Sequence, residues 1–552
     1  MLEQGVARAG TWRRFSKPAA LYLLCVTLVG AVLRVLDHAG RPFMNDEVGT
    51  LIYVDKPVAY LLTHFESWLT MNYFIIAEKF IAHIGGRSPI SLMLIPMLAG
   101  IATIPLTALL ARMLASTRVA LIAATLAAAN PYLLFYSGNI RSYSLLAALC
   151  LVVLILFFGW RERPTLRNGI FVALACVLAV LSHLNGAYVG AVLLLVTAVD
   201  LLGNLRRAGA ARAATLLGPL AVAMVLLGAA YAHLIPAIVA WGVPYHAVPP
   251  TSVSYVPYVA SQYFGDGYYA WPSLIVLLYG LLLAGRHFRP SWMLAPFLVV
   301  PSVLMSVQGI SHFPWAFGRF LIFLVPVCLV FMAEGLEAIG TRADRRSYLT
   351  PLLVGIVIIA WIPGLVTAFQ RRADLPWDRV AGYINSVSAP NDVILYRSGD
   401  ESLSLYPYFS HATQTQSVVA DYSEMQHAAA GGRTVFVVRG EPFVNSQYPT
   451  EIFGKLQVIV YPRQSYPVQL MLIRDDVLTS LRAGELSPQI TEDYRDVWAI
   501  DRKLGQDEHT TFQHYQMYRL CLELTDRQRN LPISLQYLEA QTDLRQDVMD
   551  GP

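Results

Sequence analysis

Repeated apolar runs, each long enough to cross a bilayer, constrain this chain more than any other feature of its sequence. A helix needs about 20 predominantly apolar residues to cross roughly 30 Å of hydrocarbon. About eleven such runs occur, at 19–37, 90–111, 118–136, 143–159, 169–186, 187–203, 213–236, 272–285, 292–309, 318–339 and 349–368. The sequence therefore predicts a polytopic α-helical membrane protein with about eleven transmembrane helices.

The composition agrees with a membrane location. Of the 552 residues, 55% are hydrophobic and 14% are charged, against roughly 25% charged residues in soluble domains. The formal net charge is only +4, so the chain carries no global signal for nucleic-acid binding. The five cysteines show neither metal-ligand spacing nor a disulfide framework, and we expect them to behave as buried small hydrophobic residues.

Arginine residues alternate between the loops and predict the orientation of the chain. If the N-terminus is cytoplasmic, every inside loop is rich in arginine and the outside loops carry few basic residues, which is the positive-inside pattern. The number of spans is then odd, and the C-terminus lies in the periplasm. Arg34 and Asp37 stand at the end of the first run, where a cleavage site would need small residues, so we expect an uncleaved span. The excess of arginine over lysine indicates a GC-rich bacterial genome, hence the bacterial inner (cell) membrane.

The expected transmembrane domain covers residues 1–368 and includes two long outer loops, at 38–89 and 237–271. The first loop contains an apolar helical stretch at 68–84, which we expect to lie along the membrane surface. The second loop is rich in Tyr, Pro and Trp, as suits an interfacial cap. Long outer loops between short inner ones indicate that the chemistry occurs outside.

The composition changes after Phe369. Residues 369–480 predict a periplasmic α/β domain because they contain short β-rich runs, at 393–396, 434–438, 457–461 and 468–473. Residues 481–552 are charged and mostly helical in pattern, and they predict a C-terminal extension without a span.

Unusual ionisable residues gather at the expected outer ends of the spans. Ionisable groups inside a bilayer are costly, so they are candidates for function by default. The inside ones are explained by topology, whereas the outside ones are not: Asp46, Glu47, Lys56, Glu66, Arg141, His183, His233, Asp266, His312 and Arg319. A chain that concentrates polar groups at one membrane face is expected to bind a polar ligand there.

Asp46 and Glu47 form an acid pair shortly after the first span. The structural interpretation is a pair of solvated loop acids. The functional interpretation is a general base held at the membrane surface.

Arg141 and Arg319 each stand at the outer end of an apolar helix, where the positive-inside rule disfavours arginine. Two such arginines suit a phosphate group, which the guanidinium fork matches with paired hydrogen bonds. Tyr136 and Tyr143 flank Arg141, and His183 lies at another outer span end. A lone histidine is more often structural, so both interpretations of His183 stay open at this point.

The chain resembles the GT-C superfamily of membrane glycosyltransferases, in particular the protein O-mannosyltransferase and aminoarabinose transferase type, because several of its segments match the family's motifs in the same order. The resemblance covers about residues 20–475. It rests on an ordered set of motifs: NDE at 45–47, GGRSPISLMLIP at 85–96, NPYLLFYSGNIRSYSLL at 130–146, the turn from His183 to Gly186, Arg319 with its proline-bearing span, and PWDRVAGYINSVSAPNDVILY at 376–396.

The chain departs from the family pattern at three places. Met71-Asn72-Tyr73 stands near the place of the family's His-Pro-Pro, Asn139 replaces a common acid, and Phe320 replaces a tyrosine. Because of these departures, the resemblance specifies neither the donor sugar nor the acceptor, and it leaves open whether a divalent metal is required.

The resemblance implies transfer of a sugar from a polyprenyl-phosphate donor to an acceptor hydroxyl on the outer face, with inversion at the anomeric carbon. Asp46 would be the general base, and Glu47 its alternate or a partner that orients it. The donor phosphate would be bound by five residues, Arg141, Arg319, Tyr136, Tyr143 and His183. No cofactor is specified beyond the open metal, and the acceptor is a lipid, a glycan or a protein.

Two other classes would also explain parts of the sequence. A transporter or flippase for lipids or polar solutes predicts charged groups at mid-membrane depth or an inverted repeat, and the sequence shows neither. A sensor or assembly scaffold would need its spans only as an anchor, for which eleven are excessive. The glycosyltransferase hypothesis is therefore the leading one.

Overall fold

The structure is a computed structural model. It describes residues 15–38, 43, 45–64, 71–86, 88–203, 210–236, 259, 262–265, 267–287, 289–307, 318–343, 348–370, 381, 385, 393–396, 417–419, 435–440 and 468–473. The chain forms two compact units, of which the first contains residues 1–40 with 50–369 and the second residues 41–49 with 370–552.

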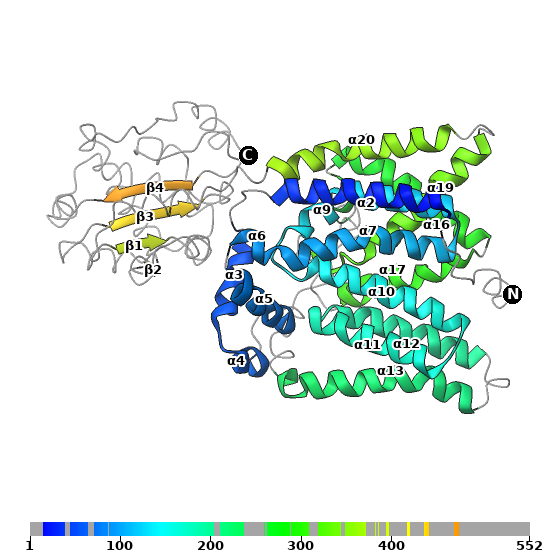
Figure 1. Cartoon of the computed structure of the whole chain (residues 1–552), viewed down its shortest axis with the longest axis horizontal. Coiled ribbons are helices and arrows are strands. Elements are labelled where there is room, and N and C mark those ends of the chain that lie inside the picture. The colour runs from blue at the N-terminus through cyan, green and yellow to red at the C-terminus, as the bar shows by residue number, and fades with distance from the viewer. Residues whose placement is uncertain are drawn as a thin grey trace, which may run out of the picture. The chain divides into compact units, whose positions relative to one another are not determined.

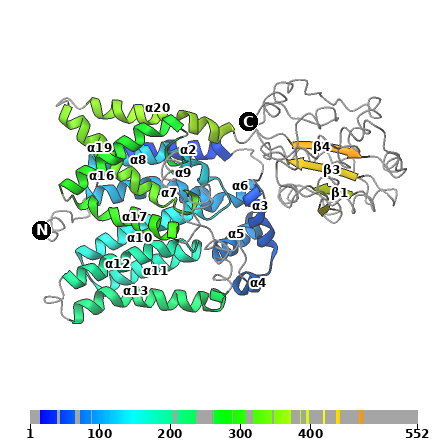
Figure 2. The same ribbon diagram turned by 180° about the vertical axis from the view of Figure 1, so that it is seen from behind.

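Each predicted apolar run of the first unit coincides with helix, so the polytopic helical architecture is confirmed (Figures 1 and 2). The helices are α2 (Lys17–His38), α7 (Leu94–Leu114), α8 (Thr117–Ala129), α9 (Pro131–Ser137), α10 (Tyr143–Glu162), α11 (Leu166–Ser182), α12 (Gly186–Gly203), α13 (Ala210–Tyr231), α16 (Trp271–Arg286), α17 (Ala295–Val307), α19 (Leu324–Ala343) and α20 (Leu349–Gln370). Short 3₁₀ segments accompany them: η1 (Ala232–Leu234), η2 (Gly267–Ala270) and η3 (Pro290–Leu294).

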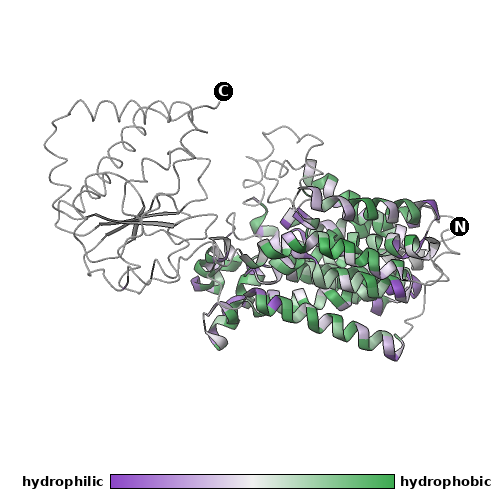
Figure 3. Ribbon diagram, turned by 90° about the horizontal axis from the view of Figure 1, so that it is seen from above, coloured by the Kyte–Doolittle hydropathy of each residue, from purple (hydrophilic) through white to green (hydrophobic). Residues whose placement is uncertain are grey.

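Within the described residues, seven helices are long and apolar enough to cross a membrane, or eight if the bent pair α8 and α9 is one span. Three further apolar helices are shorter, at Leu166–Ser182, Gly186–Leu202 and Pro290–Ser306. Eleven spans therefore require that these three also cross, and that count stays a prediction. Figure 3 shows hydrophobic residues along the helices and hydrophilic residues gathered at helix ends, as a bilayer-spanning bundle requires.

Helices α10 and α19 lie at the centre of the bundle, whereas α2 and α20 lie at its edge. The share of the span that is buried is 72% in α10 and 83% in α19, but 17% in both α2 and α20. The edge helices expose large aliphatic side chains, such as Leu28 and Ile359. Since such exposure would be costly in water, lipid is the solvent of these faces.

Two glycines allow α16 and α19 to approach closely. A Cβ atom added at Gly280 would collide with the carbonyl oxygen of Phe331, and one added at Gly335 would lie 2.6 Å from the carbonyl oxygen of Val276. Small residues at such a crossing let two helix backbones pack in van der Waals contact, which is a main source of helix association in membranes.

Among the described residues, the first long loop contains the helices α3 (Asn45–Asp55), α4 (Val58–Thr63) and α5 (Asn72–Gly85), and the short helix α6 (Pro89–Leu92) begins where the loop ends. The predicted helical stretch at 68–84 corresponds to α5, although residues 65–70 lie outside the described residues. The Asn72 Nδ2 donates to the carbonyl of Leu61 over 2.6 Å and ties α5 to α4. At the end of α13, the rings of Tyr73 and Tyr231 lie 6.0 Å apart, so α5 also contacts the bundle.

The second unit contains a four-stranded sheet in the order β2-β1-β3-β4. Its strands are β1 (Val393–Tyr396), β2 (Ser417–Val419), β3 (Val435–Gly440) and β4 (Val468–Ile473). Strand β1 pairs in parallel with β2 and β3, with Ile394 opposite Phe436, while β4 runs antiparallel to β3. Three predicted strands are present, β2 was not predicted, and the run at 457–461 lies outside the described residues. The α/β domain as a whole stays a prediction.

Candidate functional site

The five residues predicted to bind phosphate lie together around the ring of Tyr143, the first residue of α10. The guanidinium carbon of Arg141 lies 5.9 Å from the ring centroid and that of Arg319 lies 5.8 Å from it. The ring centroids of Tyr136 and His183 lie 5.2 and 5.6 Å away. We call these five residues the Tyr143 cluster; their role as ligands of phosphate remains a prediction.

The cluster is largely withdrawn from solvent. Arg141, Tyr143 and His183 are buried, while Tyr136 and Arg319 are half-buried. Two guanidinium groups near one aromatic ring are each stabilised by its π electrons. Both are permanent cations, and a guanidinium group binds an oxyanion through charge-assisted, often paired hydrogen bonds.

A break between α8 and α9 directs Tyr136 into the cluster. The two helices meet at 57°. Asn130 caps the start of α9, because its Oδ1 accepts from the backbone N–H of Leu133 over 2.9 Å, and Pro131 occupies the first helical position. The Nδ2 of Asn130 donates to the carbonyl of Tyr263 over 2.9 Å, which joins the break to the second long loop.

Arg34 binds the C-terminal end of α8, at the break between α8 and α9. Its side chain is fully buried in α2, and its guanidinium donates to the carbonyls of Ala127 and Ala128 over 3.3 Å each. These are among the last carbonyls of α8, which have no partner within their own helix. A cation is favoured at a helix C-terminus, so Arg34 stabilises the bend and thereby the position of α9.

The segment that carries Arg319 is held by hydrogen bonds from two other parts of the chain. The hydroxyl of Tyr263 lies 3.0 Å from the carbonyl of Gly318 and 3.1 Å from that of Leu321. The Nδ2 of Asn185 donates to the carbonyl of Phe320 over 3.3 Å. Two side-chain donors, of which the Tyr263 hydroxyl is shared between two carbonyls, therefore hold the backbone on both sides of Arg319.

Gly318 is required by close packing at this place. A Cβ atom at this position would collide with the side-chain oxygen of Gln262 and lie 2.8 Å from the hydroxyl of Tyr132. Tyr263, Asn185 and Asn130 were not predicted as site residues, although Asn185 stands two residues after His183 in the same turn.

His183 is a neutral hydrogen-bond donor in this environment. It ends α11, and its Nδ1 accepts from the backbone N–H of Asn185 over 3.2 Å. Burial, and then the positive charges of Arg141 and Arg319, lower the pKa of His183 from 6.5 to about 3. A neutral imidazole whose Nδ1 accepts must carry its hydrogen on Nε2. The ring therefore offers an N–H group and no charge.

Helix α3 reaches the cluster through Thr50. The buried Thr50 hydroxyl donates to the carbonyl of Ile140 over 3.0 Å, and it lies 3.5 Å from Nη1 of Arg141. Asp46 precedes Thr50 by four residues in the same helix, and the structure describes only its backbone. The side chain of the neighbouring Glu47 is fully buried.

The other predicted polar residues lie outside the cluster or outside the described residues. The Lys56 Nζ lies 5.4 Å from the ring of Tyr60, and the His233 Nε2 is 2.6 Å from the carbonyl of Leu62, both near α4. Outside the described residues lie Glu66, Asp266 and His312. Among the residues that the structure describes, no three His, Cys, Asp or Glu side chains are grouped as a metal site.

Solved structures of ArnT share the fold of this chain. The chain is similar to ArnT from Cupriavidus metallidurans in the apo state, with a TM-score of 0.51 and 14% identity, over 82% of this chain and 98% of that one. The ArnT structure bound to undecaprenyl phosphate gives a TM-score of 0.52 at 14% identity, over 83% and 98% of the two chains.

A weaker likeness links the chain to the arabinofuranosyltransferase AftD from Mycobacteria, with a TM-score of 0.48 and 16% identity, over 77% of this chain and 35% of that one. No protein-family model matches the sequence, and no curated protein sequence matches it.

Proposed function

We propose that the protein is an inverting glycosyltransferase that transfers a sugar from a polyprenyl-phosphate donor to an acceptor hydroxyl on the outer face of the membrane. The observation that carries this proposal is the placement of Arg141 and Arg319 within 6 Å of the Tyr143 ring. Two guanidinium groups and the neutral N–H of His183 provide the donors that a phosphate accepts. The structural likeness to ArnT, one structure of which contains undecaprenyl phosphate, agrees with such a donor.

The proposed reaction is one displacement at the anomeric carbon. The bond between that carbon and the phosphate oxygen breaks, and its electron pair stays on the polyprenyl phosphate. The acceptor oxygen forms the new bond from the opposite side, so the configuration inverts. Arg141 and Arg319 stabilise the charge that develops on the leaving phosphate, which is usually the largest catalytic term in such a site.

Asp46 is the proposed base that takes the proton of the acceptor hydroxyl. Helix α3 runs without a break from Asn45 to Asp55, and residues four apart lie on one face of a helix. Asp46 thus shares a face with Thr50, whose hydroxyl lies 3.5 Å from the Arg141 guanidinium. A base so positioned contributes about 10²–10⁴-fold to the rate. Glu47 is the alternate base or orients Asp46, and Asp266 is the next candidate.

A transfer assay tests the class of protein directly. Purified protein in proteoliposomes would receive a polyprenyl-phosphate sugar with a radiolabel in the sugar, together with membrane lipid and glycan extracts as acceptors. We expect the label to move covalently to an acceptor and free polyprenyl phosphate to accumulate. Movement of intact labelled donor between leaflets, without transfer, would instead indicate a flippase.

A further inference from the structure

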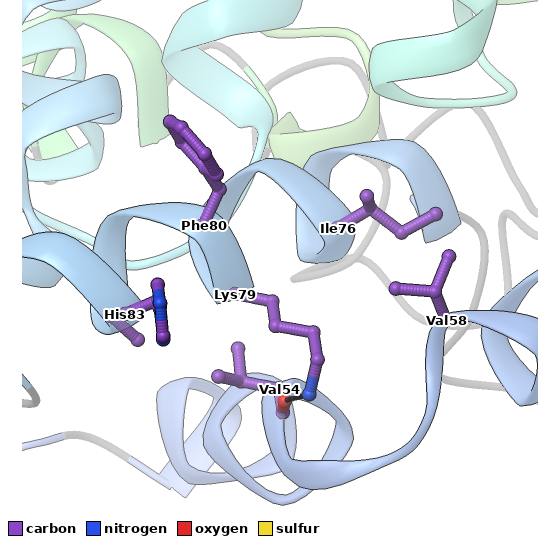
Figure 4. Close-up of a pocket in the computed structure, with 7 residues that line it drawn as sticks. Val54, Val58, Ile76, Lys79, Phe80 and His83 are labelled. Atoms are coloured by element: carbon purple, nitrogen blue, oxygen red, sulfur yellow. Dashed lines mark hydrogen bonds between the residues drawn. The ribbon is translucent and has the colours of Figure 1, made fainter.

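A pocket outside the Tyr143 cluster lies among α3, α4 and α5, with a volume of about 490 Å³ (Figure 4). This volume is in the range of small-molecule sites, roughly 300–1,000 Å³. Seven side chains line it, namely Val54, Val58, Ile76, Lys79, Phe80, Ala82 and His83. Five of them are apolar, and the two others are a lysine and a histidine.

Lys79 is fixed at the wall of the pocket. Its Nζ donates to the carbonyl of Val54 over 2.8 Å, and Figure 4 shows the side chain extending from α5 towards α3. An ammonium group has three N–H donors, and one of them is used by a described residue. His83 stands four residues later on α5, and therefore on the same face as Lys79.

Among the described residues, no acid forms an ion pair with Lys79. Glu78 precedes it in the chain, but its side chain is fully buried, and neither carboxylate oxygen has a hydrogen-bond partner among the described residues. Burial raises the pKa of Glu78 from 4.5 to about 8, so this carboxyl is largely protonated at neutral pH. Asp55 is absent from the described lining of the pocket.

The apolar part of the pocket continues along the chain into a lipid-facing helix. Phe80 is 64% exposed, and exposed apolar residues follow it in chain order: Ile84, Ile90, Leu94 and Leu98. The last two belong to α7, which is long and apolar enough to span the membrane. An amphipathic helix that leads into a span with an exposed apolar face is suited to the boundary between head groups and acyl chains.

We propose that this pocket binds an anionic glycerophospholipid of the surrounding membrane, with the lipid phosphate on Lys79 and His83 and an acyl chain against Phe80 and Ile76. A free inorganic anion would leave the apolar walls uncovered. A zwitterionic lipid would bring its own cation close to the ammonium group of Lys79, which weakens the attraction to its phosphate. This lipid site is independent of the proposed transfer reaction, whose donor phosphate is assigned to Arg141 and Arg319.

The test is lipid binding by the full-length protein in detergent. Fluorescent short-chain phosphatidylglycerol is titrated against the matched phosphatidylcholine. We expect saturable binding of phosphatidylglycerol, with phosphatidylcholine binding about tenfold more weakly. Lys79→Gln should weaken phosphatidylglycerol binding by about tenfold, and Lys79→Arg should largely retain it. Lys17→Gln, at the first residue of α2, removes a lysine far from the pocket in sequence and should have no effect.

Phe80→Gln provides a second variant that does not depend on Lys79, since the Phe80 side chain is mostly exposed and its replacement should leave the fold intact. It should weaken binding of both lipids by a similar factor. Equal affinity for the two lipids in the wild type, or affinity within twofold of wild type for both Lys79→Gln and Phe80→Gln, would overturn the proposal. Full displacement of the lipid by millimolar inorganic phosphate would also overturn it, because the pocket would then recognise the anion alone.

Discussion

The hydroxyl of Tyr263 lies 3.0 Å from the carbonyl of Gly318 and thereby holds the residue that follows, Arg319. The same hydroxyl lies 3.1 Å from the carbonyl of Leu321, so one side chain of the second long loop orders the turn before α19. A residue far from the cluster in the sequence thus controls where one of its two arginines lies.

Tyr263→Phe removes this hydrogen bonding but keeps the aromatic packing. A typical intramolecular hydrogen bond contributes about 1 kcal/mol, and loss of order at Arg319 should weaken donor binding by about tenfold. Equilibrium binding of a polyprenyl-phosphate sugar to the purified variant is the measurement. Tyr348→Phe is the matched control, because Tyr348 is exposed. Unchanged donor affinity in Tyr263→Phe would show that the Arg319 turn needs no support from this loop.

Arg141→Lys and Arg319→Lys separate charge from geometry. If both arginines hold the donor phosphate through paired hydrogen bonds, each variant should bind the donor roughly tenfold more weakly although the charge is retained. Arg118→Lys at the start of α8 is the control, because Arg118 is exposed and its segment is remote from the cluster in the sequence. Full tolerance of lysine at both positions would reduce the two arginines to interface anchors.

His183 should make the stability of the protein sensitive to acid. Its pKa is lowered from 6.5 to about 3 in the folded protein, so between these values the unfolded chain binds a proton that the folded protein does not. Stability is therefore complete above about pH 6.5 and falls as the pH drops from 6.5 towards 3. The unfolding midpoint of the wild type should fall more between pH 7.5 and 5.0 than that of His183→Gln. Equal losses would show that His183 is accessible to protons.

The orientation of the chain is tested by fusion to alkaline phosphatase, which is active only outside the bacterial cytoplasm. From the alternation of arginine we expect a fusion at the C-terminus to be active and a fusion after Arg286 to be inactive. The reverse pattern would place the Tyr143 cluster on the cytoplasmic face and would remove the proposed outer-face reaction.

The sequence predicted the helices better than their breaks. The run at 118–136 reads as one span, yet it contains the 57° bend between α8 and α9. Hydropathy does not register a bend whose two arms are both apolar, although the Asn130-Pro131 pair is a local signal for one. Strand β2 has only three residues, Ser417–Val419, which is too short for a periodic pattern.

The predicted members of the cluster are polar groups at the ends of apolar runs, where a sequence reveals them because ionisable groups are costly in or beside a bilayer. Their supports could not be found in the same way. Tyr263 and Asn185 donate to backbone carbonyls around Arg319. Because every residue has a backbone carbonyl, the residue type of the acceptor gives no signal in the sequence. Arg34 was noticed only as a residue unsuited to a cleavage site, whereas its contacts lie at the end of α8.

The turnover of Asp46→Asn tests most directly whether Asp46 is the base of the transfer reaction. Sugar transfer and donor binding are measured on the same preparation of the variant. The substitution keeps the shape of the side chain and removes the proton acceptor, so we predict a fall in turnover of at least about 10²-fold with donor binding largely retained. Asp46→Glu should also be poor, because a displacement of about 1 Å can cost 10²-fold. Glu47→Gln should cost less and serves as the adjacent control. Turnover of Asp46→Asn within about threefold of wild type, at normal expression, would contradict the account and move the base first to Glu47 and then to Asp266.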